Sequence, residues 1–212
     1  MTPLALLRSS ASLGIVAMIS ACATAARVTY NMSLKEVQRP ADVAHRWGDF
    51  TLQKSQDGFT YEDNLVQLLV VPANGSFVVT INNKTSYSMQ FLWDQASYVG
   101  PDGFSGPVSS GETRCIQKGQ SRPPETVPAM ARAILTIIPN PLIYEPYGGG
   151  CAVRDFVPQD STAVKFEGKD ARLILPLRVQ DNVNEYTLVF RMTDIAVKTC
   201  KGMSCLSQSG YH

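Results

Sequence analysis

The chain alternates between short apolar runs and polar turns from about residue 61 onward, and the apolar positions recur with a period of two. Phe77, Val79 and Ile81 fall on one face of one such run, and residues 186–192 repeat the arrangement. This period is typical of strands that bury one face. The other predicted strands share an apolar or β-branched character; they span residues 65–71, 87–93, 113–117, 129–138, 173–179 and 195–199.

Turn signals separate these runs. Asn74-Gly75 is a strong hairpin signal, and Gly148 to Gly150 indicate a flexible turn. Residues 129–138 also have helical spacing, but their β-branched ending and flanking prolines favour a strand. The proline-rich residues 122–128 predict an extended edge segment. Many short strands without a long amphipathic helix predict an all-β fold, a single antiparallel β-sandwich of the Ig-like type.

The N-terminus has the layout of an export signal. Arg8 precedes an uncharged run, residues 11–21, which is shorter than the roughly 20 apolar residues needed to span a bilayer. The run ends in Ile19-Ser20-Ala21-Cys22, which resembles the lipobox of bacterial lipoproteins. The resemblance implies that residues 1–21 are a signal peptide and that Cys22 is the lipid-modified first residue of the mature protein.

This resemblance also implies a location and partners. The lipid on Cys22 would hold the protein on a membrane in the bacterial envelope, where an envelope protein is a possible partner. Ala23 rather than Asp follows Cys22, which implies the periplasmic face of the outer membrane if the host has two membranes. An alternative is ordinary signal cleavage after Ala23-Thr24-Ala25, which would release a freely secreted chain.

The expected domain organisation follows from these features. Residues 1–21 are the signal peptide, residues 22–60 a lipidated tether and loosely structured lead-in, and residues 61–212 the β-sandwich. The strand pair within residues 77–94 is similar to the opening of small Ig-like lipoprotein domains. It is also similar to sandwiches of the late-embryogenesis-abundant water-stress type, in which Asn and Thr side chains cap strand ends.

Charge narrows the classes of partner. The chain has 19 basic and 18 acidic residues, and removal of residues 1–21 takes away only Arg8, which leaves a formally neutral protein. A neutral chain without a basic cluster argues against nucleic acid and against electrostatic docking on anionic lipid. Membrane contact is therefore expected through the lipid alone.

The cysteines that remain after Cys22 are even in number, which suggests disulfides in an exported chain. Cys200–Cys205 and Cys115–Cys151 are the pairings we favour, and free buried thiols are the alternative. A zinc site is not supported, because the sequence has only two histidines and lacks paired short Cys loops. The sequence predicts no metal and no cofactor.

No catalytic motif is evident. A Ser or Cys nucleophile needs a histidine base, and His45 lies in the poorly patterned lead-in. One alternative is an exported hydrolase that acts on envelope polymers through loop carboxylates, with Asp94, Asp102 and Glu112 as candidates. We instead expect a binding or assembly module that is not an enzyme. Its candidate binding residues are three tyrosines predicted to lie on loops: Tyr98, Tyr144 and Tyr147.

Overall fold

Strands dominate the computed structural model, which describes residues 25–39, 51–55, 58–112 and 117–200. The strands are β1 (Ala25–Gln38), β2 (Thr51–Ser55), β3 (Gly58–Glu62), β4 (Val66–Ala73), β5 (Ser76–Asn83), β6 (Met89–Phe91), β7 (Ser97–Val99), β8 (Ser105–Ser110), β9 (Glu125–Val127), β10 (Arg132–Pro139), β11 (Ile143–Tyr144), β12 (Ala152–Val153), β13 (Asp170–Val179) and β14 (Asn182–Cys200). The 3₁₀ helices are η1 (Trp93–Gln95), η3 (Asn140–Leu142) and η4 (Ser161–Phe166). The predicted all-β class is confirmed.

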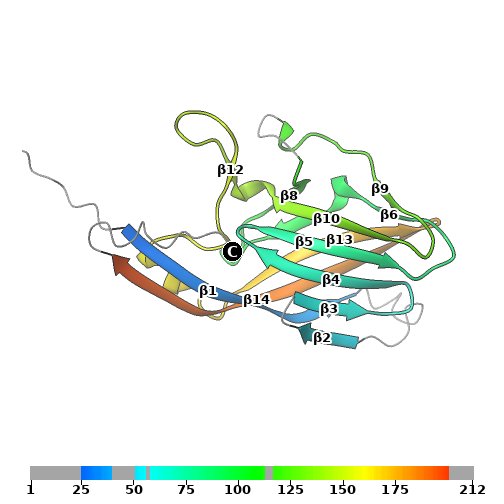
Figure 1. Cartoon of the computed structure of the whole chain (residues 1–212), viewed down its shortest axis with the longest axis horizontal. Coiled ribbons are helices and arrows are strands. Elements are labelled where there is room, and N and C mark those ends of the chain that lie inside the picture. Colours follow the sequence, from blue (N-terminus) through cyan, green and yellow to red (C-terminus); the bar gives the residue numbers. More distant parts are fainter. Residues whose placement is uncertain (1–24, 40–50, 56–57, 113–116, 201–212) are drawn as a thin grey trace, which may run out of the picture.

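Twelve strands form one antiparallel sheet, in the order β1-β14-β13-β7-β8-β10-β5-β4-β3-β2, with β6 paired to β13 and β9. The sheet curls nearly closed, and β1 and β2 are its end strands (Figure 1). A sandwich of two separate sheets is not confirmed, because β8 joins the two halves. Its residues 105–107 pair with β7 and its residues 108–110 pair with β10.

The core lies inside the curled sheet and is rich in aromatic rings. Phe77 of β5 contacts Phe190 of β14 and Phe156, with ring centroids 5.2 and 4.8 Å apart. The predicted inward positions of residues 186–192 are fully buried. Burying large rings from both halves removes much apolar surface from water, and this holds the halves together.

A buried carboxylate also links the two halves. Asp63, between β3 and β4, is 2 % exposed. It accepts backbone hydrogen bonds from Leu65 and Val66 at 2.8 and 2.9 Å. Its other oxygen accepts from the hydroxyls of Tyr61 on β3 and Tyr186 on β14, at 3.0 and 3.1 Å. The buried carboxylate therefore has both of its oxygens hydrogen-bonded, as buried polar groups usually do.

The tyrosines of this cluster are held in their protonated form. Burial, followed by the charge of Asp63, raises the pKa of Tyr61 and of Tyr186 above the ordinary tyrosine value. Arg39, which follows β1, acts in the opposite direction on both hydroxyls. The cluster thus combines groups from β3, β14 and the end of β1. It lies near the gap between β1 and β2, the two end strands that do not pair with each other.

The segment expected to be a tether and loose lead-in contains regular structure. Residues 25–38 form β1, which pairs with β14 along its length, and residues 51–55 form β2. The pairing has register shifts between Thr29 and Asn31 and between Leu34 and Glu36, and the second of them changes which side chains face inward. The β1 side chains that are buried in the core or packed against it are Val28, Tyr30, Met32, Leu34 and Val37.

Most predicted strands are present, with changes at their ends. Within the stretch 129–138, residues 132–138 belong to the strand β10 rather than to a helix, and residues 195–199 continue β14. The strand predicted for residues 87–93 shrinks to β6. Tyr87 is 53 % exposed, and Trp93 is buried in η1 instead. The predicted strand at 113–117 lies almost entirely outside the described residues.

Candidate functional site

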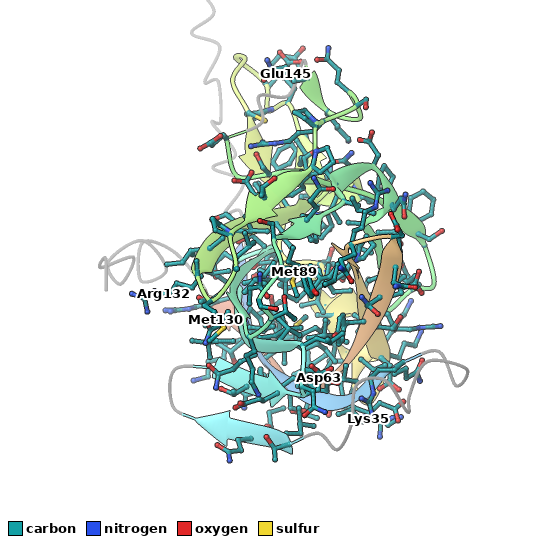
Figure 2. All side chains as sticks on the ribbon, turned by 90° about the vertical axis from the view of Figure 1, so that its right-hand side faces the viewer. Lys35, Asp63, Met89, Met130, Arg132 and Glu145 are labelled. Carbon is teal, nitrogen blue, oxygen red and sulfur yellow. The ribbon has the colours of Figure 1, made fainter. Side chains whose placement is uncertain are left out.

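A pocket of about 840 Å³ lies between the β7–β8 turn, η3, the β11–β12 hairpin and the segment that follows β12. The hairpin stands apart from the main sheet (Figure 1). Glu145, the residue after β11, lies at the end of the molecule away from Lys35 and Asp63 (Figure 2). The pocket and the Asp63 cluster are therefore separate features of the fold.

The pocket wall is mainly apolar. Phe156 is 5 % exposed and belongs to the core, whereas Phe104 at the β7–β8 turn is 65 % exposed. The apolar lining residues are Tyr98, Pro101, Phe104, Pro141, Leu142, Tyr144, Val153, Phe156, Val157, Pro158 and Phe166. A concave apolar wall with a few polar groups is the usual form of a small-molecule site.

The β4–β5 hairpin supports the pocket wall from behind. The Asn74-Gly75 turn predicted from the sequence joins Ala73 to its partner Ser76. Gly75 has a φ of 69° and lies against the backbone of Arg154, so close that an added Cβ would be 1.9 Å from the Arg154 carbonyl oxygen. On its other side, the Arg154 N–H donates to the Leu142 carbonyl at 2.9 Å. These contacts fix the backbone that carries Arg154.

Two basic side chains line the pocket. The Arg154 guanidinium lies over the Tyr144 ring, 4.8 Å from its centroid. Such stacking is favourable because the ring face is electron-rich. Lys118 donates from Nζ to the Ile143 carbonyl at 2.9 Å. Both cations thus lie beside the β11–β12 hairpin.

Two carboxylates also line the pocket. Asp102 accepts a hydrogen bond from the Phe104 N–H at 2.9 Å, which closes the β7–β8 turn. Asp155 accepts from Gln159 Nε2 at 2.9 Å and from the Tyr30 hydroxyl at 3.4 Å. Burial raises the pKa of Asp155 above the ordinary value, and the Tyr30 hydrogen bond opposes this. Asp155 also borders a second hollow, of about 410 Å³, beside β1.

The hydroxyl of Tyr98 is buried and has no hydrogen-bond partner among the described residues. Tyr98 is 2 % exposed, and its ring contacts Phe77 and Phe156 at 6.0 Å between centroids. Burial raises the pKa of this hydroxyl. A buried polar atom without a partner is uncommon and asks for an explanation.

The predicted binding tyrosines lie in different environments. Tyr98 belongs to β7 and to the core, not to a loop as predicted. Tyr144 lies in β11 and is half-buried in the pocket wall. Tyr147 lies in the β11–β12 turn and is fully exposed, outside the pocket lining. The structure thus brings Tyr98 and Tyr144 to one pocket and leaves Tyr147 beyond it.

The candidate carboxylates of the hydrolase alternative are divided between two places. Asp102 lines the pocket described above, whereas Glu112 lines a different hollow near Trp93. Asp94 accepts from the Ser121 hydroxyl and the Arg122 N–H, and these hydrogen bonds lower its pKa. Its role in the structure is to hold the segment that contains Arg122.

Several predicted residues lie outside the described part of the chain. They include Cys22, His45, Cys115 and Cys205. Cys151 precedes β12, and the backbone of Cys200 ends β14. The favoured disulfide pairings therefore stay predictions.

Sequence reasoning missed Arg154 and Asp155. Both follow the triple glycine and β12, where a basic and an acidic residue stand between Val153 and Phe156. The sequence signal that could have indicated them is a pair of charged residues within a short apolar run next to a flexible turn. Because surface loops often show the same pattern, it does not single out a binding site.

Within the segments that the structure describes, no three or more His, Cys, Asp or Glu side chains are grouped so as to hold a metal ion. None of the described helices has the length and apolar character needed to span a membrane. No family model, curated protein or solved structure matches this chain.

Proposed function

We propose that this protein is a lipid-anchored binding or assembly module of the bacterial cell envelope and not an enzyme, and that its ligand occupies the pocket beside the β11–β12 hairpin. The pocket itself is the observation that supports binding most strongly. Its volume of about 840 Å³ and its aromatic wall fit a small organic ligand. Its few polar groups would orient that ligand.

The anchoring part of the proposal rests on the lipobox resemblance at Cys22. Because β1 begins at Ala25, only Ala23 and Thr24 separate the lipidated residue from the first strand. An extended chain covers at most about 3.6 Å per residue. The start of β1 would therefore lie close to the bilayer, on the periplasmic face of the outer membrane in a host with two membranes.

Disulfides form part of the same proposal. Export to an oxidising compartment would allow Cys115–Cys151 and Cys200–Cys205 to form. The first pair would join Cys115, three residues before Lys118 in sequence, to Cys151, which directly precedes β12. Lys118 and Val153 of β12 both line the pocket.

The hydrolase alternative has less support. A glycosidase needs two carboxyl groups on either side of one substrate bond. Asp94 and Glu112 are both engaged with the segment around Arg122, and Asp102 closes a turn in another place. Each carboxylate thus has a structural partner that accounts for its position.

The binding proposal predicts where ligand contacts occur. We would add a small-molecule extract of bacterial envelopes to the ¹⁵N-labelled mature chain carrying Cys22→Ser, and record amide chemical shifts. Changes are expected in residues 98–104, 141–144 and 153–159, which contain most of the pocket lining. Phe104→Ala is expected to weaken binding about fivefold, because an aromatic contact is lost.

Ile134→Ala is the matched control for this experiment. Ile134 is 64 % exposed, almost the same as Phe104 at 65 %, but it lies on β10 outside the pocket. Its removal is expected to leave the titration unchanged. Absent shifts, or shifts scattered over the sheet, would refute the binding proposal.

A further inference from the structure

Arg154 differs from the paired arginines of this protein. Arg191 binds Asp170 at 2.8 Å and Arg122 lies 3.4 Å from Glu112. No ion pair joins Arg154 to a carboxylate in the part of the chain that the structure describes. Its guanidinium instead stacks on Tyr144. Stacking occupies the flat face of the group and leaves the N–H donors along its edge available.

The position of Arg154 is fixed by its surroundings. Its backbone lies between Gly75 and the carbonyl of Leu142. Its side chain rests on the half-buried ring of Tyr144 in the pocket wall. A guanidinium held in this way loses less conformational entropy when it binds an anion than a free surface arginine does. Its planar fork matches a carboxylate or a phosphate.

A second observation points to a ligand in the same pocket. Tyr98 is one of the lining residues, and its hydroxyl is buried and has no hydrogen-bond partner within the described segments. Because this oxygen is covered in the structure, the Tyr98 ring or its neighbours would have to move before a polar ligand atom could bond to it.

The pocket carboxylates form no ion pair with Arg154 and hydrogen-bond to other, neutral groups. Asp102 accepts a hydrogen bond from the Phe104 N–H within its own turn. Asp155 accepts hydrogen bonds from the Tyr30 hydroxyl and the Gln159 amide. The second cation, Lys118, retains two further N–H donors beside its bond to the Ile143 carbonyl. The donors that remain for a ligand are therefore mainly cationic.

We propose that the pocket binds an amphiphile whose carboxylate or phosphate is held by Arg154 and whose apolar body lies against Phe104, Leu142 and Phe156. This inference rests on the proposed binding function and defines the class of ligand. The anionic group has two possible sources, the headgroup of a membrane lipid and a free anionic amphiphile. A domain that begins three residues after a lipidated Cys22 would meet both.

The test compares three probes that share an eight-carbon chain: octyl phosphate, octyl glucoside and octyltrimethylammonium. Each is titrated below its micelle concentration into the mature chain carrying Cys22→Ser, and binding is measured by calorimetry. Octyl phosphate is expected to bind most tightly. Arg154→Gln is expected to weaken its binding at least about tenfold and to leave octyl glucoside unaffected.

Arg132→Gln is the matched control, because Arg132 is an exposed arginine on β10 outside the pocket lining. Figure 2 shows it well away from Glu145. It is expected to leave octyl phosphate binding unchanged. Vesicles of phosphatidylglycerol, compared with phosphatidylcholine, then identify the source. Arg154-dependent binding to the anionic vesicles supports a lipid headgroup, and binding to octyl phosphate alone supports a free amphiphile.

The remaining outcomes overturn the inference in distinguishable ways. Equal binding of the three probes, or tighter binding of the cationic probe, would show that the pocket binds amphiphiles without selecting an anion. No effect of Arg154→Gln on octyl phosphate binding would show that Arg154 does not hold the anion. In either case the binding function would stand and the proposed anion recognition would be wrong. No binding of any probe would contradict both.

Discussion

Asp63→Ala is expected to lower the free energy of unfolding by about 3–5 kcal/mol, the largest effect of any substitution considered. The carboxylate is 2 % exposed and accepts four hydrogen bonds. Alanine would remove the acceptor that the hydroxyls of Tyr61 and Tyr186 and the N–H groups of Leu65 and Val66 now use. Such a loss is a large share of the stability of an ordinary domain, about 5–15 kcal/mol. Urea unfolding at neutral pH measures it.

Asp160→Ala is the control for this prediction. Asp160 also accepts a backbone N–H, from Thr162 at 2.7 Å, but it is exposed at the start of η4. Its loss is expected to cost about 1 kcal/mol, which is typical of an exposed cap. Tyr186→Phe removes a single donor and leaves the carboxylate with its other hydrogen bonds, so an intermediate cost is expected. Equal effects of Asp63→Ala and Asp160→Ala would show that the buried cluster does not join the halves of the sheet.

Gly75→Ala is expected to cost about 3 kcal/mol of unfolding free energy and to disturb the pocket. The first reason is the φ of 69°, which disfavours any residue with a Cβ. The second is that the new Cβ would lie 1.9 Å from the Arg154 carbonyl oxygen, so the backbone at Arg154 has to move. Urea unfolding measures the loss of unfolding free energy, and amide chemical shifts of residues 153–156 report the disturbance of the pocket.

Gly168→Ala separates these two causes. Gly168 has a φ of 72°, nearly that of Gly75, but a Cβ added there would have no neighbour within 4 Å. It is expected to cost about 1 kcal/mol from the backbone conformation alone. If Gly75→Ala were no more costly than Gly168→Ala, the β4–β5 turn would not support the pocket wall.

Local pattern was enough to predict the strands around the Asn74-Gly75 turn. The alternation of Phe77, Val79 and Ile81 corresponds to side chains that are fully buried. The turn and the inward face are both encoded within a few neighbouring residues, so no tertiary information is needed. The same holds for residues 186–192.

β1 was missed although part of its pattern is visible. Val28, Tyr30, Met32 and Leu34 alternate with polar residues, but the series breaks after Leu34. The structure shows why, because a register shift between Leu34 and Glu36 turns Val37 inward. An irregularity of this kind depends on the partner strand, which a single sequence window does not contain.

The arrangement of the strands and the pocket depended on longer-range contacts. Strand pattern alone does not distinguish two separate sheets from one sheet continued through β8. The pocket is assembled from the β7–β8 turn, η3 and the residues after β12, which are distant in sequence. The sequence predicts a loop at Tyr98, and β7 is too short, at three residues, to show an alternating strand pattern. The contact that distinguishes Arg154 from other arginines is with Tyr144 of β11, across the hairpin, and local sequence does not indicate it.

The proposed envelope location and the proposed contact with the membrane both depend on the lipid on Cys22. Metabolic labelling with a clickable palmitate analogue therefore tests the central proposal, a lipid-anchored protein, most directly. The wild-type protein is expected to carry the label in the membrane fraction, and Cys22→Ser is expected to lose it. Label on neither protein, with mature chain recovered in the soluble fraction, would contradict the account and identify a freely secreted protein.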